Sequence, residues 1–596
     1  MNYRICVFKY LEQKVMYLPD VNYYFGIKDV YDIKLGDYEL SEEAILAIAK
    51  ENDPEEYEVF INTNFEERLN KINTYNIEEI KEESSFGQFT LCLHPSRRCN
   101  LNCKYCFRDS EYLGDEQLTF EVAKDAIDFL VEQYAPCASK YVVDLSGSGE
   151  PLLQIDLVKR IVEYCKKRRN EICKNIEVMF CTNLTLLTPE VVEYLDNEPT
   201  IILGTSIDGD QITNDFNRVY DNGKGTYEDI VKGLKMFKHK KLGLAATITP
   251  LNQDVDLIFD NLYSLPNVDC VSLRLIRNND GSEYDFENFN EKYLLSRYER
   301  LCQNIIKNIK NNNFDYLVKL VNGADVLGNL IAQNLFKGIN IIYRCDAGKN
   351  RITINNKGDI YSCSVMMGNK EFKIGNIYCG VNNVLQSKYW DIQKKVHEVC
   401  SKCTFMHMCG GECYANSYLR YNDMKCIIEK NCRIIIGLNK ISMAFIEYLK
   451  NDLNDIYDRL ISFAFRIQNY SSMDSAIWAI MTFLKLKGIK PNYDVINSQL
   501  SISGVGVKPQ DFVDYLKLYN LDINAYLLDS CDNVKPLKFP SISLANKKNI
   551  SKYIYYVNID GDGKDILFRS LETPNNSYDK TSIKDYVKNF SDIFFF

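Results

Sequence analysis

Histidine is scarce in this chain, and that scarcity narrows the chemistry that the chain can perform. Hydrolases that bind zinc, or that activate a serine, rely on histidine as a metal ligand or as a base. The sequence offers little material for either class of enzyme. Its 596 residues include four histidines, namely His94, His239, His397 and His407.

The sequence also lacks a run of apolar residues long enough to cross a membrane, and its first residues lack the apolar core of a signal peptide. The formal net charge of -10 and the isoelectric point near 5.3 argue against a broad nucleic-acid-binding surface. We therefore expect a cytoplasmic protein with no membrane span and no nucleic-acid partner.

Cysteine, by contrast, is abundant. The 21 cysteines are odd in number and cluster at spacings typical of metal sites, which differs from the framework of a disulfide-bonded secreted protein. Hydrophobic residues make up 46% and charged residues 26%, as in ordinary globular proteins. A chain of this length is too long for one core, and we expect three or four domains.

The most informative stretch follows an apolar run at 89–93 and contains three cysteines at CxxxCxxC spacing, Cys99, Cys103 and Cys106. Three thiolates suit a 4Fe-4S cluster that keeps one iron free of protein ligands. Two alternatives remain open at this point, half of a zinc site and simple buried cysteines. Zinc ribbons, however, favour CxxC pairs separated by a longer gap.

This motif, with Tyr105 before its last cysteine, resembles the cluster motif of the radical S-adenosylmethionine (radical SAM) enzymes. The resemblance implies that SAM chelates the open iron through its amino and carboxylate groups. An electron from the cluster then cleaves the sulfonium, and the resulting 5'-deoxyadenosyl radical abstracts hydrogen from an unactivated C-H bond. Cys99, Cys103 and Cys106 are the expected catalytic residues.

Residues 86–300 alternate apolar strand-like runs with helical segments such as 120–130. This alternation is typical of a parallel sheet with right-handed crossovers. Six units predict an incomplete (β/α)6 barrel resembling a TIM barrel, with its site at the C-terminal ends of the strands. The six predicted strands are 91–93, 141–145, 176–180, 201–205, 244–248 and 271–275.

A glycine-rich turn follows the second predicted strand. The run Gly147-Ser148-Gly149-Glu150-Pro151 resembles the GGEP turn of the radical SAM family, with serine in place of one glycine. The resemblance implies that Gly149 lets the backbone approach the methionine moiety of SAM. It also implies that Glu150 supplies either charge complementarity or order in the turn.

Three later loops extend the resemblance. Asn183 after the third strand and Ser206 after the fourth are implied to lie near the SAM ribose, and Asp208 near SAM or the substrate. Arg218 could pair with the SAM carboxylate through its planar guanidinium. Together with Tyr105, Gly149 and Glu150, these four are the predicted cofactor-binding residues.

A second group of cysteines lies between residues 341 and 435 and resembles the SPASM domain, which in relatives holds two auxiliary 4Fe-4S clusters. A zinc site is the alternative interpretation. The fourth ligand of one cluster is left open: Cys379, Cys426 or an open iron that takes a substrate sulfur. The resemblance assigns Cys400, Cys403, Cys409 and Cys432 to one cluster, and Cys345, Cys363 and Cys413 to the other.

The two ends of the chain lie outside these blocks. Residues 1–85 read as a small α/β module, with a helix expected from Ser41, and resemble the leader-binding front ends of peptide maturases. A barrel-capping extension is the alternative. Residues 455–596 resemble the leader-cutting cysteine peptidase of bacteriocin exporters, which implies an α+β papain-like domain. The alternative is a stabilising C-terminal extension.

That second resemblance is to a degenerate peptidase. Ser475 stands where the nucleophile should begin its helix, Tyr553 stands where the histidine belongs, and no histidine follows His407. A Cys-His dyad cannot be assembled, so we expect leader binding without proteolysis. A hairpin is expected from 552–559 and 566–568.

These resemblances predict an α/β protein with domains at 1–85, 86–300, 341–435 and 455–596 and bridging helices at 301–340. We predict a radical SAM/SPASM maturase of a ribosomally made, cysteine-rich precursor peptide (a RiPP), forming a thioether crosslink. The predicted partners are the precursor peptide and an electron donor such as ferredoxin or flavodoxin. The alternatives are an anaerobic sulfatase-maturating enzyme that makes formylglycine, and a non-catalytic iron-sulfur electron carrier or peptide-binding protein.

Overall fold

A computed structural model provides the structure of the chain. It describes residues 2–28, 33–52, 57–58, 81, 88–106, 117–136, 138, 140–147, 149–172, 175–277, 281–323, 325–335, 341, 343–391, 398–457, 459–460, 473–489, 502–503, 506–507, 509–519, 521, 523, 525–527, 540–544, 555–561, 565–569, 579–583, 585–586 and 593–595.

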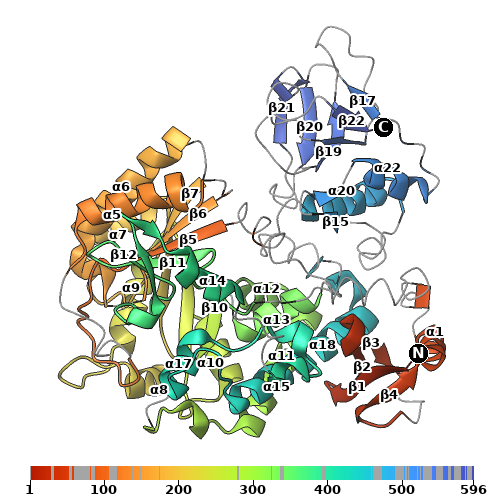
Figure 1. The fold of residues 1–596 in the computed structure, drawn as a ribbon, viewed down its shortest axis with the longest axis horizontal. Helices are drawn as coiled ribbons and strands as arrows, with labels where there is room; N and C mark the ends of the chain where they lie inside the picture. The colour runs from red at the N-terminus through yellow and green to blue at the C-terminus, as the bar shows by residue number, and fades with distance from the viewer. Residues whose placement is uncertain are drawn as a thin grey trace.

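A parallel sheet forms the centre of the protein (Figure 1). Its six strands pair in the order β10-β9-β8-β7-β6-β5, and every pair is parallel, which confirms the predicted architecture. The far side of β5 pairs with a later strand and not with β10, so the sheet does not close into a barrel. The strands are β5 (Gln88–Leu93), β6 (Lys140–Asp144), β7 (Asn175–Thr182), β8 (Ile201–Ser206), β9 (Leu242–Ile248) and β10 (Val268–Leu275).

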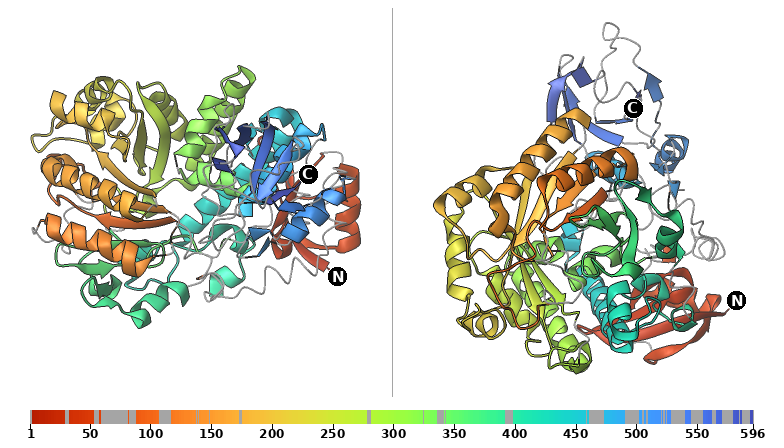
Figure 2. Two further views of the ribbon diagram at one scale, coloured as in Figure 1. Left: turned by 90° about the horizontal axis from the view of Figure 1, so that it is seen from above. Right: turned by 60° about the vertical axis from the view of Figure 1, so that its left-hand side comes forward.

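Helices connect these strands and lie around the outside of the sheet (Figure 2). Several begin at a side-chain cap: Thr119, Thr188 and Asp210 each accept a hydrogen bond from a backbone N–H in the first turn. Their apolar faces pack against the strands in one core, and the loops lie at the ends of the strands. The helices are α5 (Phe120–Phe129), α6 (Ile155–Ile172), α7 (Pro189–Asn197), α8 (Gln211–Asn217), α9 (Tyr227–Met236) and α10 (Val255–Tyr263).

The central sheet continues into the second cysteine-rich segment. β11 (Arg351–Ile354) pairs in parallel with β5, and β12 (Asp359–Tyr361), β13 (Lys373–Asn376) and β14 (Gly380–Val381) extend it in antiparallel fashion to ten strands. The sequence alone did not predict this continuity. Short helices follow, namely α14 (Asn383–Asp391), α15 (Glu398–Ser401), α16 (Met406–Cys409) and α17 (Tyr414–Tyr421).

One long helix, α18 (Glu429–Asp452), packs against both the N-terminal strands and the bridging helices. Fourteen of its residues are buried, which explains why it can have apolar contacts on opposite sides. The bridging segment begins earlier than residue 301, because its first helix already starts at Glu291. Its helices are α11 (Glu291–Lys310), α12 (Asp315–Asn322) and α13 (Val326–Asn334).

The N-terminal residues form an antiparallel sheet in the order β3-β2-β1-β4. The expected helix is present as α1, and the Ser41 hydroxyl accepts a hydrogen bond from the N–H of Ala44 at 3.2 Å. One face of the sheet packs on α1, and the other joins the main core, where Tyr17 stacks on Phe405 at 4.9 Å. The elements are β1 (Asn2–Tyr10), β2 (Gln13–Leu18), β3 (Tyr23–Ile27), β4 (Gly36–Ser41) and α1 (Glu42–Asn52).

The C-terminal part contains a six-stranded antiparallel sheet in the order β17-β22-β18-β19-β20-β21. The predicted hairpin is confirmed as β19 with β20. Tyr553 and the side chain of Ser475 lie outside the described residues, so the peptidase resemblance stays a prediction. The elements are α20 (Met473–Leu486), β15 (Ile502–Ser503), β16 (Gly506–Val507), α22 (Pro509–Lys517), β17 (Ala525–Leu527), β18 (Ser541–Leu544), β19 (Tyr555–Gly561), β20 (Asp565–Arg569), β21 (Asp579–Ser582) and β22 (Ile593–Phe595).

Within the described ranges, no helix combines the length and apolar character that a membrane crossing requires.

Candidate functional site

The loop after β5 brings Cys99, Cys103 and Cys106 together at the C-terminal edge of the sheet. Backbone hydrogen bonds hold it to the loop after α8: the N–H of Asn102 donates to the carbonyl of Val219 at 2.7 Å. Cys99 and Cys103 are partly buried and Cys106 is exposed. The loop that bears the three thiols is therefore held in place by a segment more than 100 residues later in the chain.

Burial and neighbouring charged groups change the pKa of the Cys103 thiol. Burial raises the pKa of the Cys103 thiol to about 11; Arg218 lowers it, and Asp208 and the other two thiols raise it further. A bound metal would replace the protons of such thiols, since metal ligands are thiolates. Arg218 is placed to offset part of the resulting negative charge.

The turn after β6 packs directly on the cysteine loop. Gly149 adopts a positive φ of +72°, and the backbone N–H of Glu150 donates to the carbonyl of Arg98 at 2.8 Å. The Glu150 carboxylate is buried and accepts hydrogen bonds from Leu152, Thr182 and Asn183. Of the two roles considered for Glu150, these contacts support order in the turn.

Gly149 leads to a testable prediction. A Cβ at this position would lie 2.4 Å from the carbonyl oxygen of Ser96, so Gly149→Ala combines a backbone clash with an unfavourable φ. We expect destabilisation by about 3 kcal/mol and a loss of bound iron. Gly223→Ala is the matched control, because φ is +78° there but no atom lies within 4 Å; it should cost only about 1 kcal/mol. Thermal melts and iron analysis would measure both, and equal effects would contradict the clash.

The third and fourth strand ends carry Asn183 and Ser206. The Asn183 amide donates to Asn100 at 2.9 Å and lies 3.8 Å from the sulfur of Cys99. The Ser206 hydroxyl lies 3.6 Å from the sulfur of Cys181. Both residues are thus at the predicted edge of the sheet, and Asn183 also positions the cysteine loop.

Tyr105, Asp208 and Arg218 form one buried chain of contacts. The Tyr105 hydroxyl donates to Asp208 Oδ2 at 2.6 Å and accepts from Arg218 Nη1 at 2.7 Å. Burial raises the pKa of Asp208, while the backbone N–H of Thr247 also donates to its carboxylate. This chain connects the cysteine loop to the loops after β8 and α8.

The Nε–H group of the Arg218 guanidinium is a further feature of this edge. Its Nε is buried, and no hydrogen-bond partner for it is found in the described part of the structure. A buried donor without a partner is costly, and an anionic ligand group would remove that cost. Three grouped thiols and this free donor fit the predicted cluster and the carboxylate of SAM.

The second cysteine group divides into the two predicted sets. Burial raises the pKa of Cys363 to about 12, with Cys413 and Cys345 raising it further. In the other set, burial raises the pKa of Cys432 to about 12, and Cys409, Cys400 and Cys403 add to the shift. The fold therefore brings together the residues of each set, and their role as cluster ligands stays a prediction.

The two candidates for a fourth ligand lie in different surroundings. Cys379 is exposed in the turn between β13 and β14. Cys426 is partly buried, and burial followed by Asp423 raises the pKa of its thiol. Neither position decides the fourth ligand.

The spacing of the cysteines also bears on the zinc alternative. Among the described residues, no three Cys, His, Asp or Glu side chains are arranged to hold one metal ion. Cubane ligands bind different iron atoms, so their sulfur atoms are spread more widely than those around a single zinc ion. The geometry is compatible with the predicted clusters.

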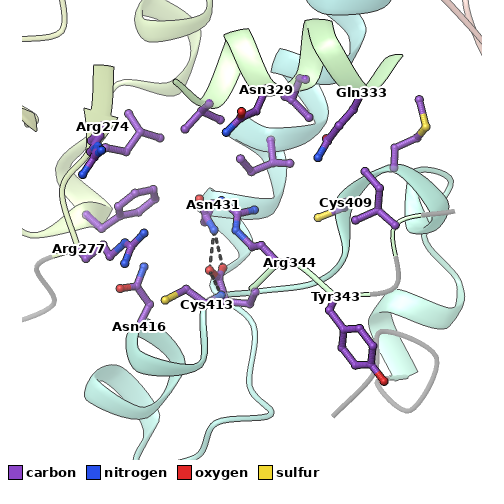
Figure 3. A pocket seen from close by; sticks show the side chains of 18 of the residues that line it. Arg274, Arg277, Asn329, Gln333, Tyr343, Arg344, Cys409, Cys413, Asn416 and Asn431 are labelled. Carbon is purple, nitrogen blue, oxygen red and sulfur yellow. Dashed lines mark hydrogen bonds between the residues drawn. The ribbon is translucent and has the colours of Figure 1, made fainter. Parts of the chain in front are cut away.

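A cavity of about 370 Å³ lies between the end of β10 and the second cysteine group (Figure 3). Arg274 and Arg277 enter it from the end of β10, and Arg344 enters it from the segment before Cys345. Sequence reasoning missed these arginines. The rule that selected the earlier strand ends applies equally to 271–275, and it would have found the first two.

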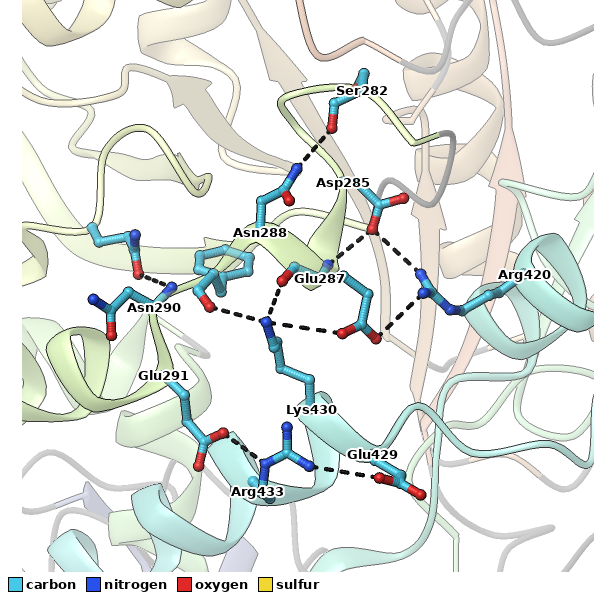
Figure 4. A network of polar contacts seen from close by, with 12 residues as sticks. Ser282, Asp285, Glu287, Asn288, Asn290, Glu291, Arg420, Glu429, Lys430 and Arg433 are labelled. Atoms are coloured by element: carbon cyan, nitrogen blue, oxygen red, sulfur yellow. Dashed lines mark hydrogen bonds and ion pairs between the residues drawn. The ribbon is translucent and has the colours of Figure 1, made fainter.

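Ion pairs connect α17 and α18 to residues 285–291, which follow β10 (Figure 4). Arg420 on α17 pairs with Asp285 at 3.3 Å and with Glu287 at 3.4 Å. Arg433 on α18 pairs with Glu291 at 2.7 Å, and Lys430 donates to the carbonyl of Phe289 at 3.1 Å. These contacts hold the wall of the cavity against the strand ends.

His94 follows β5 directly and leads to a pH prediction. Its ring is buried, neither nitrogen has a partner within the described residues, and burial lowers the pKa to about 4. The unfolded chain therefore takes up the proton first, and stability falls as the pH drops from about 6.5 towards 4.

We expect the wild type to lose about 1 kcal/mol between pH 7.5 and 5.5 that His94→Gln does not lose. Thermal melts at both pH values would measure this difference. His239→Gln, at an exposed histidine, should retain the wild-type dependence. An unchanged pH dependence in His94→Gln would contradict the assignment.

Comparison with known proteins gives a consistent result. Residues 93–256 match the family model described as Radical SAM superfamily. An uncharacterized protein of Methanocaldococcus jannaschii is 30% identical over 273 residues, which cover 42% of this chain and 92% of that protein.

Two relatives have named activities. The serine-type anaerobic sulfatase-maturating enzyme of Bacteroides thetaiotaomicron is 22% identical, over 60% of this chain and 89% of that protein. The radical SAM cyclopropyl synthase TigE of Paramaledivibacter caminithermalis is 25% identical, over 61% of this chain and 74% of that protein.

A solved structure supports the fold. Native anSMEcpe with bound AdoMet and Kp18Cys peptide has a TM-score of 0.50 and 17% identity, covering 63% of this chain and 99% of that chain. At this identity the likeness concerns the fold.

Proposed function

This chain belongs to the radical SAM superfamily, and from that premise we propose that it is a maturase that modifies a ribosomally made precursor peptide, forming a thioether crosslink to a cysteine. Membership implies a 4Fe-4S cluster and SAM as cofactors. The observation that carries the proposal is that the loops after β6, β7 and β8 all contact the loop that bears Cys99, Cys103 and Cys106.

The residues of this edge have separable roles. Cys99, Cys103 and Cys106 would hold the cluster, and the loop that bears them is held in place by Gly149 and Glu150. When bound, the cluster and SAM supply an electron and the removal of a hydrogen atom from a substrate C-H bond.

Arg218 and Asp208 balance charge around the same edge. Arg218 Nε would donate to the carboxylate of SAM, and its Nη1 would stay on Tyr105. Asp208 accepts a hydrogen bond from the Tyr105 hydroxyl, which leaves the oxygen of that hydroxyl available to accept a hydrogen bond from Arg218.

The proposed crosslink balances as follows. One hydrogen atom leaves the peptide carbon and ends in 5'-deoxyadenosine, and the thiol proton leaves to solvent. A carbon-sulfur bond forms, and one electron remains and needs an acceptor. Seven cysteines are proposed to hold two auxiliary clusters that take this electron, bind the thiol, or do both, namely Cys345, Cys363, Cys400, Cys403, Cys409, Cys413 and Cys432.

The domains at the two ends are proposed to bind the leader of the precursor. β4 is an edge strand of the N-terminal sheet, and an extended peptide can add to such an edge through backbone hydrogen bonds. The C-terminal sheet and α20 are proposed to form a degenerate peptidase-like domain without cleavage activity. A ferredoxin or flavodoxin is the proposed electron donor.

A sulfatase maturase is the second candidate, because one relative with that activity aligns over 60% of the chain. It would convert a serine or cysteine to formylglycine and would need no crosslink. The domain beyond residue 455 has no evident part in that reaction, so we rank it second. A non-catalytic iron-sulfur protein is the third, and SAM cleavage by the reconstituted protein would exclude it.

Mass spectrometry tests the proposal. Reduced enzyme incubated with SAM and the peptide encoded beside its gene should remove two hydrogens from the peptide per link and consume one free thiol. A formylglycine product, detected by aldehyde labelling of a sulfatase peptide, would favour the second candidate. Deoxyadenosine release with both peptides unmodified would overturn both.

A further inference from the structure

The arginine-lined cavity between the strand ends and the second cysteine group has a use beyond the proposed reaction (Figure 3). Arg277 and Arg344 point toward its centre from different sides, and Asn329 and Gln333 reach into it from α13. A volume of about 370 Å³ is within the range of ligand sites and far exceeds one side chain.

The charge of the cavity is strongly one-sided. Among the described residues, its lining contains three arginines and one acidic residue, Glu412. That carboxylate is already occupied, since Asn431 donates to both of its oxygens at 2.7 Å and the N–H of Cys413 donates at 2.7 Å. Among the described residues, no ion pair with a carboxylate occupies Arg274, Arg277 or Arg344.

Arg277 and Arg274 interact electrostatically with different cysteine thiols. The thiols of Cys413, Cys363 and Cys345 raise the pKa of Arg277, so this guanidinium faces the proposed auxiliary ligands. Burial raises the pKa of the Cys181 thiol, which contacts Ser206; Arg274 is among the groups that lower it. The cavity, whose lining includes Arg274, Arg277 and Cys413, therefore lies between the end of β10 and the proposed auxiliary ligands.

Arg277 alone could serve as counter-ion to an auxiliary cluster, but that would leave two arginines unexplained. Guanidinium groups bind carboxylates through paired, charge-assisted hydrogen bonds, and the nearby amides can complete such a site. In an unmodified ribosomal peptide, the anionic groups are aspartate, glutamate and the C-terminus.

We propose that this cavity binds a carboxylate of the substrate peptide, an Asp or Glu side chain close to the reacting residue, held by Arg274 and Arg344 with Arg277 beside the auxiliary cysteines. This inference rests on the proposed peptide substrate and narrows it. It makes the enzyme selective for an acidic residue at one position relative to the crosslink, independently of leader binding.

Selection from a random dodecapeptide mRNA-display library on the reconstituted enzyme tests this by binding alone. The display format blocks the C-terminus, so any acidic preference must come from side chains. Wild type should enrich Asp or Glu at one position, and a synthetic Glu peptide should bind about tenfold more tightly than its Gln counterpart. A preference restored only by a free C-terminus would assign the site to that carboxylate.

Variants then locate the preference. The double variant Arg274→Gln, Arg344→Gln should reduce the Glu-over-Gln ratio to about twofold or less, whereas Arg160→Gln, at an exposed position on α6, should keep it. Arg344→Lys should retain part of the ratio, which guards against simple misfolding. Iron content and the visible spectrum check that the clusters survive.

The outcomes separate this inference from the proposed function. Peptide enrichment without an acidic position, or an acidic preference unchanged in the double variant, overturns the carboxylate site and leaves peptide maturation standing. Absence of any peptide enrichment also overturns the carboxylate site, and the mass-spectrometric test with the full precursor decides the proposed function separately.

Discussion

Replacing Cys103 by alanine is expected to abolish SAM cleavage, with deoxyadenosine formation falling by at least about a thousandfold and iron falling by about four atoms per chain. Cys103 interacts electrostatically with Arg218 and with the other two thiols, and its loss leaves two protein ligands for a cluster that would have three. Chromatographic assay of deoxyadenosine and iron-sulfide analysis would measure both effects.

Cys165→Ala is the matched control for this substitution. Cys165 is buried in α6 and lies outside every cysteine group described above. The control should keep the iron content and the cleavage rate of the wild type. Full activity in Cys103→Ala would show that the cluster is held elsewhere, and a comparable loss in Cys165→Ala would indicate general misfolding.

Replacing Cys413 by alanine is the second large prediction, and it should separate the two chemistries of the chain. We expect deoxyadenosine formation to continue at a rate similar to that of the wild type, while crosslinked peptide falls at least about a hundredfold. Iron should again fall by about four atoms, because Cys413 interacts with Cys345 and Cys363 as one set. Mass spectrometry of the peptide alongside the deoxyadenosine assay would measure the uncoupling.

Cys302→Ala, at a buried thiol in α11, is the corresponding control and should leave both readouts unchanged. The same assay applied to Cys379→Ala and Cys426→Ala would identify a fourth ligand, since only its loss should reproduce the behaviour of Cys413→Ala. Equal loss of cleavage and crosslinking in Cys413→Ala would contradict an auxiliary role.

Much of the central architecture could be predicted from local pattern. Each of the six strands is a short apolar run between helical segments, and parallel pairing brings their C-terminal ends to one edge. Gly149 and Asp208 were identified by the resemblance of their loops to radical SAM motifs, and both loops follow predicted strands. The same logic, extended one strand further, would have identified Arg274 and Arg277.

Other features depended on contacts between distant residues. The pairing of β11 with β5 joins positions such as Arg351 and Thr90, which no local pattern relates. The sequence left two roles open for Glu150, and the hydrogen bonds from Thr182 and Asn183 support order in the turn. Side-chain hydrogen bonding depends on the relative placement of loops, which a linear pattern does not contain.

The sequence by itself determined the cysteine spacing, the parallel α/β core and the superfamily, because these depend on residue type and on separations of a few residues. Only the tertiary structure decided that Arg420 and Arg433 pair with acidic residues after β10, and that three arginines meet in a cavity beside the second cysteine group. Those arrangements arise from the packing of α17, α18 and β10, whose residues lie far apart in the chain and meet only when the chain is folded.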